Sequence, residues 1–203
     1  KLSIVSHRVD GYKHYGYVRY PRDYNPEELY PVLVVNHGGN RGHDIIAARG
    51  VGQRVEGQCT DGYFVIGASY RGEPMRAMIN GQMRTFQSEG PDMDDPEYWR
   101  TVFDGDVNDV LHLLNGALDN IPGADAQRIG VTGGSRGAGV SYLLGVRDPR
   151  IDLMGLYYGA THHMSPRIKE VIRSHIESGS PLQGADVNVA WESAVALFID
   201  GAI

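Results

Sequence analysis

The residue with the clearest capacity for chemistry is Ser135, which stands between glycines in the stretch Gly133–Gly137. The strand-like run Arg128–Thr132 precedes this stretch, and helix-like sequence continues from it to Val146. A G-x-S-x-G sequence at a strand-to-helix junction is typical of a nucleophile elbow, a turn so tight that the neighbours of the serine must be small. Such a turn holds the serine Oγ above the sheet, so the spacing predicts Ser135 as a candidate nucleophile.

A second candidate feature is the glycine pair in Asn36-His37-Gly38-Gly39-Asn40, which follows a strand-like run. Glycines at the end of a strand let the bare backbone turn back toward the carboxyl edge of the sheet and present N–H donors. Acyl transfer needs such donors, because the tetrahedral intermediate concentrates negative charge on one oxygen. The ring of His37 is expected to support this loop through a hydrogen bond rather than to act as a base.

Strands and helices alternate along the chain, which indicates an α/β fold with a mostly parallel sheet flanked by helices. The strand candidates are Tyr15–Tyr20, Pro31–Asn36, Tyr63–Ser69, Arg128–Thr132 and Leu153–Tyr158. The helix candidates are His43–Gln58, Pro96–Leu118, Gly137–Val146, Pro166–Ser178 and Ala190–Ile199. Continuous apolar runs such as Val32–Val35 and Phe64–Ile66 predict strands that are covered on both faces.

The helix predicted over Pro96–Leu118 has one apolar stripe with spacings of three and four, formed by Trp99, Phe103, Val107, Val110, Leu111 and Leu114. Its segment Asp104–Asp109 imitates the first half of a calcium loop, but Asp109 stands where that loop needs a glycine. A solvated helix face is therefore the expected role of these aspartates, and no metal site is predicted.

The segment Arg71–Asp95 interrupts the alternation of strands and helices. It carries several glycines, prolines and methionines, and it reads as a long loop. Long loops in compact domains are usually functional or mobile. Two interpretations stay open: the segment lines a site, or it only covers the sheet.

Taken together, these motifs resemble the α/β-hydrolase superfamily, above all the prolyl-oligopeptidase-type peptidases and their esterase and dienelactone-hydrolase relatives. The matching pieces occur in the family's order and are Tyr17–Pro21, Pro31–Gly39, Gly62–Ile66 with Ser69–Gly72, Asp106–Leu114 and Asp125–Gly139. The resemblance implies Ser135 as the nucleophile and the backbone N–H groups of Gly39 and Arg136 as oxyanion donors. It also implies that the loop Tyr70–Gly72 borders the pocket. The implied function is a serine hydrolase that cleaves an ester or amide bond through an acyl-enzyme, without a cofactor.

The resemblance leaves two members of a catalytic triad unassigned. In this fold the order along the chain is serine, then acid, then histidine. The histidines after Ser135 are His162, His163 and His175, but residues 160–203 read as the start of a helical cap. We therefore expect residues 1–203 to form a single hydrolase core that lacks its last strands, with the base and its carboxylate beyond Ile203.

Two other functions stay open beside the hydrolase. The run Thr132–Gly139 also looks like the glycine loop of an NAD(P)-dependent short-chain dehydrogenase. That reading expects a carboxylate at the end of the next strand to hold the ribose, where this chain has Tyr157–Ala160. The other alternative is a hydrolase fold without catalysis that binds a partner.

The side chain of Arg136 has two interpretations of its own. A guanidinium beside the nucleophile could hold a substrate carboxylate, because it forms paired hydrogen bonds with carboxylates. A surface salt bridge is the other interpretation. The sequence does not choose between them.

Composition narrows the partners and the setting. The 203 residues are 41% hydrophobic and 22% charged, which suits one globular domain. The net charge of −6 argues against nucleic acid as a partner, and no apolar run approaches the roughly 18 residues of a membrane span. Cys59 is the only cysteine and is expected to be a buried apolar residue. The expected partner is a small ester or peptide substrate. The oligomeric state and the compartment, cytoplasmic or exported with the signal removed, stay open.

Overall fold

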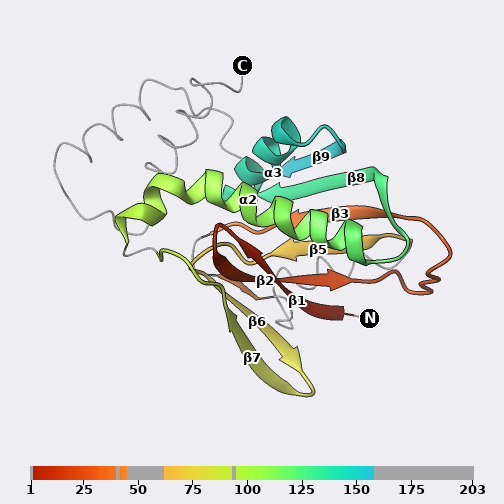
Figure 1. Cartoon of the computed structure of the whole chain (residues 1–203), viewed down its shortest axis with the longest axis horizontal. Coiled ribbons are helices and arrows are strands. Elements are labelled where there is room, and N and C mark those ends of the chain that lie inside the picture. Colours follow the sequence, from red (N-terminus) through yellow and green to blue (C-terminus); the bar gives the residue numbers. More distant parts are fainter. Residues whose placement is uncertain (1, 40–41, 45–61, 93–94, 158–203) are drawn as a thin grey trace.

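A computed structural model of the chain describes residues 2–39, 42–44, 62–92 and 95–157. Its main sheet has six strands in the order β1-β2-β5-β3-β8-β9 (Figure 1). They are β1 Leu2–Val9, β2 Tyr12–Arg19, β3 Tyr30–Asn36, β5 Phe64–Ala68, β8 Ala124–Gly134 and β9 Ile151–Tyr157. The strands from β5 to β9 run parallel, whereas β2 pairs antiparallel with β5 and β1 pairs antiparallel with β2. The mostly parallel sheet is therefore confirmed, with an antiparallel extension that includes the unpredicted strand β1.

The described helices, α2 Pro96–Asn120 and α3 Arg136–Arg147, lie on one face of this sheet (Figure 1). Helix α2 begins after Asp95, whose side chain accepts a hydrogen bond from the Glu97 N–H at 2.8 Å. Asp95 thereby satisfies one of the backbone donors that the first turn leaves without a partner, and Pro96 has no N–H to satisfy. Strand β8 ends at Gly134 and helix α3 begins at Arg136, so the turn between them contains Ser135 alone.

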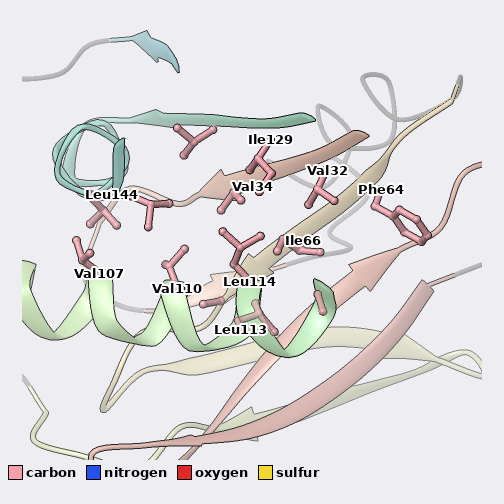
Figure 2. Packing of buried hydrophobic residues seen from close by; sticks show 14 of the residues in the cluster. Val32, Val34, Phe64, Ile66, Val107, Val110, Leu113, Leu114, Ile129 and Leu144 are labelled. Carbon is pink, nitrogen blue, oxygen red and sulfur yellow. The ribbon is translucent and has the colours of Figure 1, made fainter. Parts of the chain in front are cut away.

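The main core lies between these helices and the sheet (Figure 2). Alternate residues of the two apolar runs, Val32, Val34, Phe64 and Ile66, face the helices. The apolar stripe predicted for α2 is confirmed for Phe103, Val107, Val110, Leu111 and Leu114, whereas the side chain of Trp99 lies outside the described part. The intervening residues Val35 and Val65 are buried on the opposite face of the sheet. Both faces of these strands are covered, as the continuous apolar runs predict.

A second, smaller sheet corrects the prediction of a long loop over Arg71–Asp95. Strands β6 Pro74–Ile79 and β7 Gln82–Gln87 form an antiparallel hairpin, and the short strand β4 His43–Asp44 pairs parallel with β6. Asn80 and Gly81 form the hairpin turn with φ values of 50° and 76°, as a tight turn between twisted strands requires. Met75 and Ala77 of β6 pack in the core cluster on the second face of the main sheet. Part of the segment therefore covers the sheet.

Several other predictions concern residues that lie partly or wholly outside the described part of the chain. The helix expected over His43–Gln58 is wrong at its first two residues, which belong to β4, and residues 45–58 lie outside the described part. Cys59 lies outside it as well. The same holds for residues 158–203, which include the expected cap, the later helix candidates and the three histidines that follow Ser135.

Candidate active site

The two glycine-containing motifs meet at one edge of the sheet. Strands β3 and β8 are parallel neighbours, and Asn36 at the end of β3 pairs in register with Gly133. The loops that follow both strands therefore leave the same edge side by side. A Cβ on Gly38 would lie 2.8 Å from the Gly134 carbonyl oxygen and 3.2 Å from the Cβ of Ser135. Only a residue without a side chain lets the two loops approach so closely.

Ser135 has the backbone conformation expected from its position. Its φ is 54° and its ψ is −123°, a backbone conformation that residues with a side chain rarely adopt. The strain of such a conformation typically lowers the stability of the folded state by about 1–3 kcal/mol. The residue is exposed, and its side chain makes no capping hydrogen bond to α3. Its backbone carbonyl accepts a hydrogen bond from the Ala138 N–H at 3.0 Å, which starts the helix. The turn thus fixes the backbone of Ser135 and leaves its hydroxyl free of a capping role.

The glycines that flank Ser135 are required by the tightness of this turn. A Cβ on Gly133 would lie 2.2 Å from the Gly137 carbonyl oxygen, and a Cβ on Gly137 would lie 2.2 Å from the Asn36 carbonyl oxygen. Both contacts are to backbone, which has little room to move. The spacing of the G-x-S-x-G sequence is therefore explained by packing at these two positions.

The loop after β3 is held through its carbonyl groups. The Gly38 carbonyl lies 3.1 Å from His37 Nδ1, and the Gly39 carbonyl accepts a hydrogen bond from Arg136 Nη1 at 3.0 Å. The expected hydrogen bond between the His37 ring and its loop is thus confirmed. Because a trans peptide directs its N–H opposite to its C=O, the Gly39 N–H points away from the His37 ring. The Arg136 N–H stands at the first position of α3, where a helix offers no internal acceptor.

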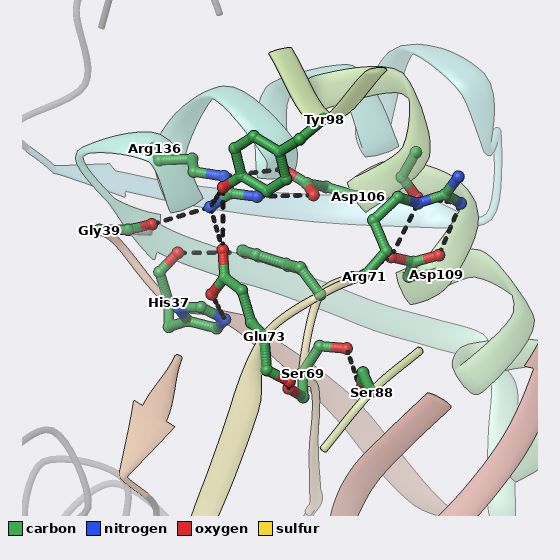
Figure 3. Close-up of polar contacts among 12 residues, drawn as sticks. His37, Gly39, Ser69, Arg71, Glu73, Ser88, Tyr98, Asp106, Asp109 and Arg136 are labelled. Atoms are coloured by element: carbon green, nitrogen blue, oxygen red, sulfur yellow. Dashed lines mark hydrogen bonds and ion pairs between the residues drawn. The ribbon is translucent and has the colours of Figure 1, made fainter. Parts of the chain in front are cut away.

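The guanidinium of Arg136 lies between the Gly39 carbonyl and Asp106 (Figure 3). Its Nε and Nη2 donate to the two carboxylate oxygens of Asp106 at 2.8 and 2.7 Å, and its Nη1 donates to Glu73 Oε1 at 2.5 Å. Its face lies 4.6 Å from the ring centre of Tyr70. With 9% of the Arg136 side chain exposed, these ion pairs are buried, so the interpretation of Arg136 as part of a surface salt bridge is wrong. The guanidinium is engaged by carboxylates of the protein itself rather than turned toward a substrate.

The aspartates of α2 correct a second prediction. Asp106 and Asp109 are fully buried, so they do not form a solvated helix face. Asp109 accepts hydrogen bonds from the backbone N–H of Arg71 and from its guanidinium, both at 2.8 Å. Arg71, in the loop expected to border the pocket, is itself buried. Within the described part of the chain, no group of three or more His, Cys, Asp or Glu residues could hold a metal ion.

Burial governs the charges in this region. Burial raises the pKa of Asp106 to about 7, although the Arg136 guanidinium acts in the opposite direction. Burial alone would lower the pKa of Arg136, but Asp106 and Glu73 raise it well above its usual value, so the guanidinium stays charged. Burial and the nearby charge of Arg136 lower the pKa of His37 to about 3. The ring of His37 is therefore neutral at physiological pH.

Sequence reasoning missed Glu73, Tyr98 and Asp106 as members of this region. Tyr98 donates its hydroxyl hydrogen to Glu73 Oε1 at 3.0 Å and accepts a hydrogen bond from Arg136 Nη1 at 2.8 Å. These three residues stand 30 to 63 positions away from Arg136 in the chain, so no local pattern could have joined them. The available signal was weaker: a glutamate directly after Tyr70-Arg71-Gly72, in a segment suspected of lining a site.

Ser135 also weakens the dehydrogenase interpretation of Thr132–Gly139. A nucleotide-binding glycine loop would leave Ser135 with ordinary helical angles, whereas its φ is 54°. The run follows β8, which lies between β3 and β9 and comes late in the order of strands along the chain. A dinucleotide fingerprint normally follows the first strand of its domain.

No protein-family model and no curated protein matches the sequence. Solved structures do match its fold. The acylaminoacyl peptidase of Pyrococcus horikoshii is 18% identical, with a TM-score of 0.60 over 80% of this chain and 23% of its own. A puromycin-hydrolyzing peptidase of Mycobacterium tuberculosis is 21% identical, with a TM-score of 0.55 over 96% of this chain and 26% of its own. An esterase is 16% identical, with a TM-score of 0.55 over 82% of this chain and 46% of its own.

This chain therefore spans less than half the length of these three proteins. None of the helices in the described part of the chain is long and apolar enough to span a membrane. The similar structures are peptidases and esterases of the same fold type, and they match most of this chain at low sequence identity. The protein has the fold of these proteins, the α/β-hydrolase fold that its sequence motifs resemble.

Proposed function

We propose that the protein is a serine hydrolase that cleaves an ester or amide bond through an acyl-enzyme on Ser135. The observation that carries the proposal is the conformation of Ser135, an exposed serine with φ of 54° between a parallel strand and a helix. A strained backbone of this kind persists only where the surroundings enforce it, and it is concentrated at functional sites. The close approach of Gly38 adds a loop with backbone donors beside the serine.

The reaction would proceed in two steps. The Ser135 Oγ attacks the carbonyl carbon of the substrate, and the tetrahedral intermediate collapses to an acyl-enzyme as the alcohol or amine leaves with a proton. Water then attacks the acyl group and releases the acid. In this proposal the N–H groups of Gly39 and Arg136 donate to the oxyanion in both steps, a contribution typically worth about 3–4 kcal/mol for each donor.

A serine hydroxyl also needs a base, which in this fold is a histidine held by a carboxylate. The order of serine, acid and histidine puts that base after Ser135 in the chain. The described residues after Ser135, which end at Tyr157, contain no histidine. We therefore assign neither the base nor its carboxylate.

The names of the similar structures support the proposed substrate class. Two of these proteins are peptidases, one of which hydrolyses puromycin, and the third is an esterase. Serine hydrolases attack esters and amides through the same intermediates. We propose a small ester or a short peptide as the substrate.

The test compares Ser135→Ala with the wild type in the full-length protein, on short-chain nitrophenyl esters and on aminoacyl amides. The proposal expects Ser135→Ala to lower kcat by at least about a thousandfold, because the covalent step is lost. Ser6→Ala, at an exposed serine of β1, is the matched control and should keep the wild-type kcat. Wild-type turnover by Ser135→Ala would refute Ser135 as the nucleophile, and folded but inactive wild type would favour a binding protein without catalysis.

A further inference from the structure

The loop between β3 and β4 is held by side chains on both sides of residues 40–41. On the first side, the His37 carbonyl accepts a hydrogen bond from the Tyr70 hydroxyl at 3.1 Å, and the Gly39 carbonyl accepts one from Arg136. On the second side, the Gly42 N–H donates to Glu73 Oε2 at 3.0 Å. We call the described residues 37–39 and 42 the glycine loop. The side chains that bind its backbone in these contacts are those of Arg136, Tyr70 and Glu73.

Glu73 connects the two sides of the glycine loop. Its Oε1 accepts from Arg136 Nη1, the same nitrogen that donates to the Gly39 carbonyl (Figure 3). Its Oε2 accepts from the Gly42 N–H. Oε2 also lies 3.8 Å from Nε2 of the His37 ring. The carboxylate of Glu73 thus lies against Gly42 at the end of the glycine loop and against His37 at its beginning. It also binds Arg136, the first residue of α3.

Glu73 is itself firmly held. Its carbonyl accepts hydrogen bonds from the Ser69 hydroxyl at 2.9 Å and from the Ser88 N–H at 3.1 Å, and its N–H donates to the Tyr70 carbonyl at 3.1 Å. The side chain is 3% exposed. Burying a carboxylate is costly unless hydrogen-bond donors satisfy its oxygens, and Glu73 has a donor on each of them. The backbone and the carboxylate of Glu73 are therefore both held in place by hydrogen bonds.

We propose that Glu73 is a positioning residue that, through its ion pair with Arg136, fixes the glycine loop relative to Ser135. The inference rests on the proposed function for its catalytic meaning. Arg136 lies next to Ser135 in the chain, so the ion pair joins the residue after the nucleophile to the loop that supplies the other donor. Glu73 touches neither the Ser135 hydroxyl nor the position of a substrate in this proposal. It acts through the loop.

The expected effect is on the rate of the chemical step more than on substrate binding. Donors for an oxyanion act only where the charge develops, so a shift of about 1 Å in the loop can lower the rate about a hundredfold. Glu73→Gln keeps the size of the side chain and one acceptor oxygen. That oxygen can serve Arg136 or the Gly42 N–H but not both, because the amide nitrogen is a donor only.

The experiment measures kcat, KM and backbone hydrogen exchange for Glu73→Gln in the full-length protein. We expect kcat to fall by about ten- to a hundredfold with KM changed less than about threefold, and the amides of the glycine loop to exchange faster than in the wild type. Tetrahedral adducts of a trifluoromethyl ketone should weaken in parallel with kcat, because they need the same donors.

Asp109→Asn is the matched control, since it disrupts a separate buried ion pair, the one with Arg71, whose side chain makes no described contact to the glycine loop. It should lower the thermal midpoint but leave both kcat of the folded protein and exchange in the glycine loop near wild type. Unchanged kcat and unchanged loop exchange in folded Glu73→Gln would overturn the role of Glu73. If Ser135→Ala keeps full turnover, the proposed function fails instead, and hydrogen exchange still decides whether Glu73 holds the loop.

Discussion

Gly38 and Ser135 lie so close that a Cβ on Gly38 would stand 3.2 Å from the Cβ of Ser135. The two residues belong to loops that follow neighbouring parallel strands, about a hundred positions apart in the chain. Their contact depends on the register between β3 and β8 and on the lack of a side chain at Gly38. This contact is the geometric basis of the proposed active site, and it can be disturbed with a single methyl group.

Replacing Gly38 with alanine should impair activity more than stability. The added Cβ would lie 2.8 Å from the Gly134 carbonyl oxygen, so the glycine loop and the turn at Ser135 must move apart. Because oxyanion donors tolerate little displacement, we expect kcat to fall about a hundredfold. Steady-state kinetics and chemical unfolding of the same preparation check this, and a Gly38→Ala variant with wild-type kcat would contradict the close contact.

Replacing Gly116 with alanine should stabilise the protein. Gly116 is exposed on α2, and a Cβ there meets nothing within 4 Å. Alanine in a helix interior is favoured over glycine by about 1 kcal/mol, so the free energy of unfolding should rise by about that amount. Gly105→Ala on the same helix is the control: its Cβ would lie 2.4 Å from Nε of the buried Arg71, and the same measurement should show a loss.

Asp104 and Asp106 stand two residues apart on α2 but should respond very differently to replacement by asparagine. Asp106 is fully buried against Arg136, and breaking a buried ion pair by removing one charge typically costs about 3–5 kcal/mol. The Asp104 side chain is 47% exposed and pairs with Arg147, so its loss should cost at most about 1 kcal/mol. Urea unfolding of both variants measures the difference, and equal losses would be inconsistent with the burial of Asp106.

A buried neutral histidine should make the free energy of unfolding depend on pH. Burial lowers the pKa of His14 to about 4, below its ordinary value of 6.5. Between these values the unfolded chain binds a proton that the folded chain does not, so the contribution of His14 to stability is lost as the pH falls from about 6.5 to 4. Each pKa unit corresponds to about 1.4 kcal/mol.

Asp106 changes the free energy of unfolding with pH in the opposite sense, because burial raises its pKa to about 7 and the folded chain binds its proton first as the pH falls. The comparison that isolates His14 is therefore His14→Gln against the wild type at several pH values. The free energy of unfolding of the wild type should fall relative to that of the variant by a few kcal/mol between pH 7 and pH 4. A difference that is constant over this range would mean that His14 titrates normally in the folded protein.

The sequence predicted the parts of the fold that have a strong local signal. Val32–Val35 and Phe64–Ile66 are apolar without interruption, and both are buried on two faces. The hairpin β6–β7 was missed because β7 is exposed over nearly its whole length and so lacks an apolar pattern. Its signal was the Asn80-Gly81 pair, which marks a tight hairpin turn between two strands.

The candidate site could be predicted where it depends on the backbone and not where it depends on distant side chains. The G-x-S-x-G spacing led to Ser135 because it is a local pattern, although only the crowding at Gly133 is local and that at Gly137 comes from Asn36. Asp106 was placed on a solvated face, although it stands four residues before Val110 and thus on the buried side of α2. Its partner Arg136, 30 positions away, offsets the cost of that burial, and a linear pattern does not contain this pairing.

The most direct test of the account is covalent labelling of Ser135. The full-length protein is treated with a fluorophosphonate probe, digested, and analysed by mass spectrometry, with loss of esterase activity followed in parallel. We predict a single adduct on the peptide that contains Ser135, with activity lost in proportion to labelling. Ser135→Ala should give no adduct, and Ser6→Ala should label like the wild type. An adduct on another residue, with Ser135 unmodified and activity abolished, would contradict the assignment of Ser135 as the nucleophile.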